Sequence, residues 1–103
     1  MGIGTDIGGS VRVPAAFCGA FGLRTTALRN PLKGVIAAGS GQESIRAVIS
    51  PLANSAEDID LFQQALLDME PWEEEVSLVP MPWKRIEPLQ VQKLTIGVIW
   101  DDG

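Results

Sequence analysis

The sequence contains no histidine and one cysteine, and these two scarcities restrict its chemistry more than any other feature. Without histidine, the chain alone can build neither a Ser-His nor a Cys-His catalytic pair, and it offers no imidazole to a metal ion. With Cys18 as the sole thiol, an internal disulfide and a thiolate zinc site are excluded too, and this fits a reducing compartment. Acid–base catalysis must use lysine or carboxylate side chains, or a group from outside these residues.

Long apolar runs and strongly basic segments are also absent. No run reaches the roughly eighteen apolar residues of a membrane-spanning helix, and the N-terminus lacks a basic stretch followed by an apolar block. We therefore expect no membrane span and a cytoplasmic protein. The net charge is -5, and the few basic residues of the first half are not interleaved with aromatics, which disfavours a nucleic-acid partner.

The clearest secondary-structure pattern predicts a helix over about residues 56–69. Ser55 is a good N-cap residue, and Asp58 follows three positions later as in a capping box. Apolar residues then recur at helical spacing until Pro71. Four of the seven prolines lie in residues 70–92, and we expect an extended surface connection there. Its tryptophans are expected to pin it to a neighbouring surface; they are Trp72 and Trp83.

The remaining patterns predict short elements and one further strand. Pro14 suits the first turn of a short helix that ends at Gly19 or Gly22, and a short buried strand is expected within 20–26. β-branched residues at about 94–100 predict a central, parallel-type strand that is covered on both faces. These elements are too few for a complete core in a domain of this length. The sequence therefore predicts a slice of a larger α/β protein.

Residues 2–12 are glycine-rich and hold the candidate site. They lack the lysine of a phosphate-binding P-loop, the third glycine of a dinucleotide fingerprint and the last glycine of a hydrolase elbow. The consecutive amides of Ile7, Gly8, Gly9 and Ser10 can form a concave set of N–H donors, with the Ser10 hydroxyl at its end. A nucleophile beside its own oxyanion hole suits acyl transfer. The alternative is a glycine-rich turn with a surface serine.

Five segments resemble the amidase signature family, in its fungal acetamidase-like form. They are GTDIGGSVR at 4–12, PAAFCG at 14–19, GLR at 22–24, SPLANSAED at 50–58 and LTIGVIWDDG at 94–103. The first three are the most specific and span twenty-one residues. The resemblance implies an α/β fold with a mixed β-sheet flanked by helices, of which residues 1–103 are a partial domain.

The resemblance also implies an amide hydrolase with a Ser–Ser–Lys triad that needs no metal and no cofactor. Ser10 matches the nucleophile in the loop at residues 4–12. The residues that match the oxyanion hole are Ile7, Gly8, Gly9 and Ser10, and those that match site-shaping positions are Thr5, Asp6 and Arg12. Arg12 is expected to pair with Asp6, and Cys18 is expected to be buried in the core. The substrate implied is a small amide such as acetamide.

The sequence departs from the family in ways that bear on activity. In the family the bridging serine and the lysine base lie upstream of the nucleophile loop, so we expect the upstream half of the domain to be missing from this chain. The lysines present do not match the base; they are Lys33, Lys84 and Lys93. Thr25 replaces a usual proline and Ser50 a usual glycine, and both changes are expected to loosen turns.

Three interpretations follow from these departures. The first is a fragment of an amidase that carries the nucleophile and the oxyanion hole only. The second is an inactive truncated paralogue, which binds an anion at the amide cluster or packs against a partner. The third is a chain that does not fold alone, because its core is incomplete.

Overall fold

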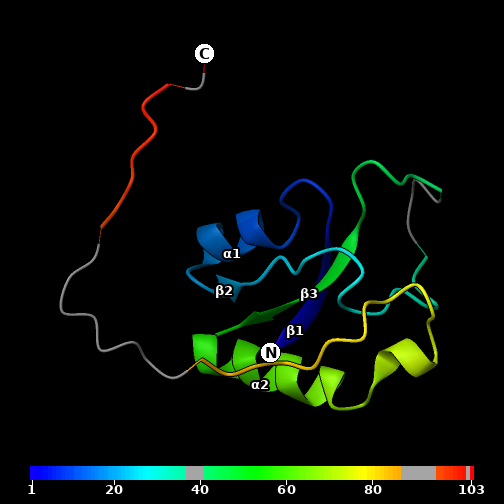
Figure 1. Ribbon diagram of the computed structural model, residues 1–103. Helices are drawn as coiled ribbons and strands as arrows, with labels where there is room; N and C mark the ends of the chain where they lie inside the picture. The colour runs from blue at the N-terminus through cyan, green and yellow to red at the C-terminus, as the bar shows by residue number, and fades with distance from the viewer. Residues whose placement is uncertain (37–40, 87–94, 102) are drawn as a thin grey trace.

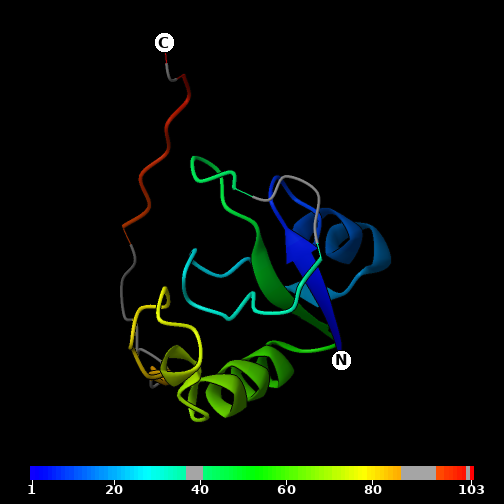
Figure 2. The ribbon, with the colours of Figure 1, turned by 90° about the vertical axis from the view of Figure 1, so that its right-hand side faces the viewer.

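A computed structural model describes residues 1–36, 41–86, 95–101 and 103. Its elements follow one another as strand β1 (Gly2–Asp6), helix α1 (Arg12–Cys18), strand β2 (Phe21–Gly22), strand β3 (Val48–Ala53), helix α2 (Ala56–Leu67) and a 3-10 helix at Pro71–Glu73. In Figure 1 the sheet lies between the two helices, and Figure 2 shows the same arrangement from the side. The chain is thus α/β, as the sequence predicts, with a sheet flanked by helices.

The sheet has three strands in the order β1-β3-β2, and both strand pairs are antiparallel. β1 pairs with β3 from Gly2 opposite Leu52 to Asp6 opposite Val48. The sheet is therefore antiparallel in the described part, where the resemblance implied a mixed one. β3 is central, and its alternate residues are buried on both faces, because α1 packs over β2 on one side and α2 packs against β3 on the other.

Helix α2 forms where the sequence predicts it. The Ser55 side chain accepts a hydrogen bond from the Asp58 amide at 3.1 Å, which confirms the N-cap. The helix ends at Leu67, two residues before the predicted end, and Glu70 then turns the chain in the left-handed region. Its buried face is centred on Gln63 and Leu67 rather than on the predicted apolar stripe.

Gln63 lies in the core because it has a partner there. Its side chain and that of Asn30 exchange two hydrogen bonds, at 2.9 and 3.2 Å, and Asn30 also donates to the carbonyl of Ile49 in β3. Both amides are buried, so the cost of desolvating them is offset by these bonds. This pair joins helix α2, strand β3 and the loop after β2.

The two departures from the family pattern also meet in the core. The buried Thr25 amide donates to the Ser50 hydroxyl at 3.5 Å, and the Thr25 hydroxyl donates to the Ile49 carbonyl at 3.2 Å. Proline lacks that amide and glycine lacks that hydroxyl, so the two replacements supply each other's partner. The two positions are thus linked to each other through the core, and a looser turn at either stays a prediction.

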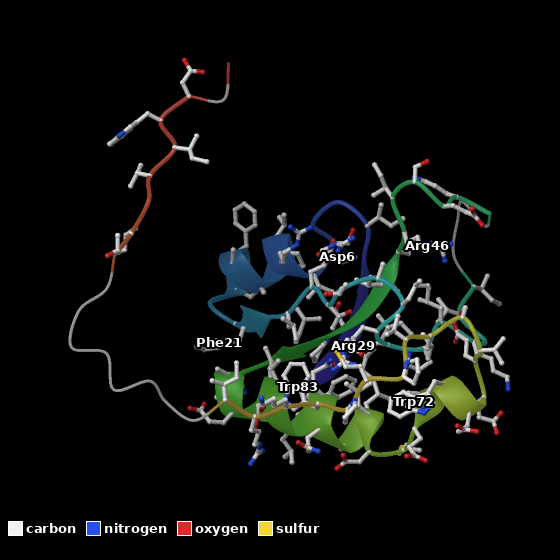
Figure 3. The ribbon with its side chains drawn as sticks, viewed as in Figure 1. Asp6, Phe21, Arg29, Arg46, Trp72 and Trp83 are labelled. Carbon is white, nitrogen blue, oxygen red and sulfur yellow. The ribbon has the colours of Figure 1, made fainter. Side chains whose placement is uncertain are left out.

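The connection after α2 is held against the body of the protein. The Trp83 indole N–H donates to the Asp60 carboxylate in α2 at 2.6 Å, as the sequence predicts for a pinning tryptophan, while Trp72 is half-buried (Figure 3). Arg29 donates to the carbonyls of Met81 and Pro82. Residues 87–92 of the predicted connection lie outside the described residues.

The strand predicted at about 94–100 is not formed in the part that the structure describes. Residues 95–101 have no regular structure, and the side chains of Ile96, Val98, Ile99 and Trp100 are exposed. A strand needs a neighbour for its backbone groups, and these residues pair with none of the three described strands. A high content of β-branched residues does not by itself provide a neighbouring strand.

Candidate active site

The glycine-rich segment forms strand β1 and then a tight loop at residues 7–11 that leads into α1. The loop turns at Gly9, whose φ of +131° is open to glycine and strained for other residues. The Gly9 carbonyl accepts from the Val13 amide at 2.7 Å, and this bond starts the helix. Ser10 follows Gly9 in this turn, and it is exposed next to the first turn of α1.

The buried side chain of Asp6 holds this loop in place through hydrogen bonds to its backbone. Its side chain has no solvent exposure, and it lies where β1 ends and the loop begins (Figure 3). Its carboxylate accepts three backbone amides, from Gly9 at 2.7 Å, Val11 at 3.2 Å and Arg12 at 3.4 Å. One side chain thus fixes the loop at three points, which restricts the positions that Ser10 can adopt.

Two arginines balance the buried charge of Asp6. Arg12 bonds both carboxylate oxygens at 3.0 Å, and the Arg24 Nε atom lies 3.6 Å from Oδ1. The predicted pairing of Arg12 with Asp6 is confirmed; Arg24 was not predicted, because no sequence spacing indicates it.

The bonds from Arg12 hold the pKa of Asp6 well below its usual range, opposed by burial and assisted by the three amides. The same ion pair raises the pKa of Arg12. A carboxylate of such low basicity, with both oxygens already engaged by Arg12 and the loop amides, is no candidate for the general base.

The four predicted oxyanion-hole amides are not equivalent in the structure. The Gly9 amide is engaged by Asp6, so in this state it is not available to a ligand. Within the described part of the chain, the amides of Ile7, Gly8 and Ser10 donate to no other group. Three donors thus remain on the loop beside the Ser10 hydroxyl.

The loop sits close to the sheet because two strand positions lack side chains. Val11 is fully buried and packs over Gly4 of β1 and Gly22 of β2. A Cβ atom at Gly4 would lie 2.9 Å from the Val11 side chain, and one at Gly22 would lie 2.9 Å from Ala15 and 3.1 Å from Val11. Such contacts require a shift of the helix. Glycine is therefore needed here for space rather than for a turn.

No base for Ser10 is found among the described residues. The Ser10 hydroxyl makes no hydrogen bond there. Lys33 forms an ion pair with Glu74 at 2.9 Å, Lys84 is exposed, and Lys93 lies outside the described residues. The described part of the chain also contains no group of three or more His, Cys, Asp or Glu side chains that could hold a metal ion.

Two other sequence expectations concern residues around the loop. Thr5 is exposed on β1, and its side chain makes no hydrogen bond within the described ranges. Cys18 is exposed at the end of α1, so its predicted burial is wrong. The helix buries Ala15, and Val11 just before it is buried as well, whereas Cys18 is exposed. In the part of the chain that the structure describes, no helix is long and apolar enough to cross a membrane.

Comparison with known proteins places these features in a family. The sequence profile described as Amidase matches residues 1–103. The chain is 47% identical to the acetamidase of Aspergillus oryzae and 44% identical to that of Emericella nidulans, each over 87 residues. These alignments cover 84% of this chain and 16% of each relative. An amidase of Gibberella moniliformis is 39% identical over 99 residues, or 95% of this chain and 18% of that protein.

The structure has a counterpart as well. It superposes on a fatty acid amide hydrolase with a TM-score of 0.79 and 45% sequence identity, over 82% of this chain and 15% of that protein. The described sheet and helices are therefore part of the amidase signature fold. The chain spans between a seventh and a fifth of the length of the proteins it matches. From its sequence profile and its fold, the chain belongs to the amidase signature family.

Proposed function

We propose that this chain is the nucleophile-bearing part of an amide hydrolase of the Ser–Ser–Lys type. The observation that carries the proposal is the loop at residues 7–11, which the buried Asp6 carboxylate fixes while the Ser10 hydroxyl stays exposed. The bridging serine and the lysine base would come from outside these residues. The similarity to amidases and to an amide hydrolase supports the reaction class.

The arrangement suits attack on an amide carbonyl. Ser10 Oγ would bond to the carbonyl carbon after losing its proton to the base, and the carbonyl oxygen would become an oxyanion. The amides of Ile7, Gly8 and Ser10 can donate to that oxyanion, and each such donor typically accounts for about 10²–10³-fold in rate. Protonation and loss of the amine leave an ester on Ser10, which water hydrolyses to the acid.

The proposed substrate is a small carboxylic amide. Two relatives at 44–47% identity are named acetamidases, whereas the structural match is named a fatty acid amide hydrolase. These names differ in the acyl group, although the matched segment is the same. The loop therefore supports amide cleavage in general, and acetamide is the first substrate to test.

A chimera tests the proposal directly. Replacing the matched segment of the Aspergillus oryzae acetamidase with the aligned residues of this chain combines Ser10 with the remainder of a related enzyme. We expect acetamide turnover and an acyl adduct on Ser10 in mass spectra, both lost in Ser10→Ala and kept in Ser44→Ala. A chimera whose turnover survives Ser10→Ala would refute the role of Ser10. The 103-residue chain alone should show no appreciable turnover, because no residue that the structure describes supplies a base to Ser10.

The inactive alternative has one observation in its favour, the three free amides beside Ser10. If the chain binds an anion there without covalent chemistry, acetate binding measured by NMR should survive Ser10→Ala. In that case the Ser10→Ala chimera should bind acetate as tightly as the chimera with Ser10 does. No acyl adduct should form on Ser10 in either the chain or the chimera.

A further inference from the structure

Arg24 connects the three strands at one end of the sheet. It follows β2 by two residues, and its Nη2 atom donates to the Arg46 carbonyl at 3.3 Å, just before β3 begins. Its Nε atom lies 3.6 Å from Asp6 at the end of β1. Nη1 donates to the neighbouring Thr25 carbonyl at 3.4 Å. The guanidinium therefore meets groups at the end of β1, before β3 and after β2.

Its role differs from that of Arg12. Arg12 belongs to the same short segment as Asp6, so their bonds order the loop internally. Arg24 is separated from Asp6 by helix α1, and its partner Arg46 lies 22 residues further on. It is also the less exposed of the two, with 27% of its side chain accessible against 50% for Arg12. Asp6 is itself paired with Val48 in the β1–β3 ladder; of the two arginines, Arg24 is the one that also reaches a group outside the 6–12 segment, the Arg46 carbonyl.

We propose that Arg24 is a positioning residue, which fixes the Asp6-held nucleophile loop relative to the sheet and so sets the direction from which Ser10 meets its substrate. The importance of that direction rests on the proposed function of Ser10. The coupling of Arg24 to Asp6 and to the loop does not, and it can be measured in the chain without any substrate.

The test is a pH titration of the Asp6 carboxyl carbon by NMR in the 103-residue chain. The charged groups that face Asp6 are Arg12 and Arg24. In Arg24→Met the cation 3.6 Å from Oδ1 is lost, and we expect the pKa of Asp6 to rise. Arg46→Met is the matched control, because it removes an arginine side chain that pairs with Glu43 and leaves its own carbonyl in place. It should not move the titration.

Amide hydrogen exchange gives the second readout. In Arg24→Met the amides of Gly9 and Val11 should exchange at least about fivefold faster relative to those of the β1–β3 pairs. Arg24→Lys keeps the charge but offers a single donor site, so it should restore the Asp6 pKa and only part of the protection. An Asp6 titration and loop exchange that are unchanged in Arg24→Met would overturn the proposal.

A loss of folding in Arg24→Met would be recognised by the loss of the Asn30 and Gln63 side-chain amide signals, which report on the core. Arg24→Lys then decides alone. Faster exchange confined to Gly9 and Val11 supports the proposal, and exchange equal to that of the parent overturns it. The two proposals can fail separately. If chimera turnover survives Ser10→Ala while Arg24→Met still shifts the Asp6 titration and speeds loop exchange, the proposed function is refuted and the coupling of Arg24 to the loop stands.

Discussion

Replacing Asp6 should destabilise the chain more than any other single change of charge. In Asp6→Ala, two buried amides lose their acceptor, those of Gly9 and Val11, at about 1–3 kcal/mol each. The half-exposed Arg12 regains water, so its release adds little. We expect a loss of about 3–4 kcal/mol for Asp6→Ala and about 2 kcal/mol for Asp6→Asn, which keeps one acceptor oxygen. A small domain has only about 5–15 kcal/mol of stability in total.

Urea unfolding followed by far-UV circular dichroism measures these losses by linear extrapolation. Asp101→Asn is the control, since it removes an equal charge from an exposed position. Its unfolding free energy should stay within about 0.5 kcal/mol of that of the parent. An Asp6→Asn variant that is as stable as this control would refute the idea that the carboxylate holds the loop.

The same ion pair sets the pH dependence. The folded pKa of Asp6 lies below its unfolded value of about 3.9. Its contribution is therefore complete above that pH, and it is lost as the pH falls below it towards the folded pKa. The difference in unfolding free energy between the parent and Asp6→Asn should be constant from pH 8 to about pH 5 and should shrink in more acidic solution.

Three further substitutions test the core and the loop. Gly9→Ala forces a residue with a Cβ into a φ of +131°, so it should cost about 1–3 kcal/mol in urea unfolding; an unchanged midpoint would show that the loop can turn otherwise. Gln63→Leu removes both bonds that Gln63 exchanges with the buried Asn30 and leaves Asn30 Oδ1 without its donor; it should cost about 2 kcal/mol, but less when Asn30→Leu is added, and strictly additive losses would argue against the pair. Thr25→Pro should be better tolerated together with Ser50→Gly than alone, and a double-mutant cycle in thermal unfolding measures the coupling.

The helices were largely predictable because their signals are local. Ser55 and Asp58 specify the start of α2 through one bond between residues three apart, and Pro14 in the first turn of α1 and Gly19 at its end are equally local signals. Gln63 was missed on the buried face because a polar residue is stable there only with its partner Asn30, which is far away in sequence.

The strands were harder to predict, because strand formation depends on partners. β1 reads as a glycine-rich loop, and Ser50-Pro51 interrupts the apolar pattern of β3. Both form because they pair with each other across more than forty residues. The apolar residues at 95–101 illustrate the converse, since they have the composition of a strand and no partner among the described strands.

In the candidate site, too, the local features were predictable from the sequence and the long-range contacts were not. The residues of the loop and the pairing of Asp6 with Arg12 followed from a short contiguous motif. The engagement of the Gly9 amide and the contact of Arg24 required three-dimensional positions, because each depends on how the loop folds back over the sheet.

The packing of Val11 over Gly4 and Gly22 has a consequence for how such a sequence can change. Both glycines adjoin the Val11 side chain, so a side chain gained at Gly4 must be matched by atoms lost at Val11 or Leu52, and one gained at Gly22 by atoms lost at Val11 or Ala15. A single mutation in this group is therefore expected to destabilise the fold unless a second one compensates for it. Along an evolving lineage we therefore expect these separate positions to change together, where the loop at residues 7–11 meets the sheet.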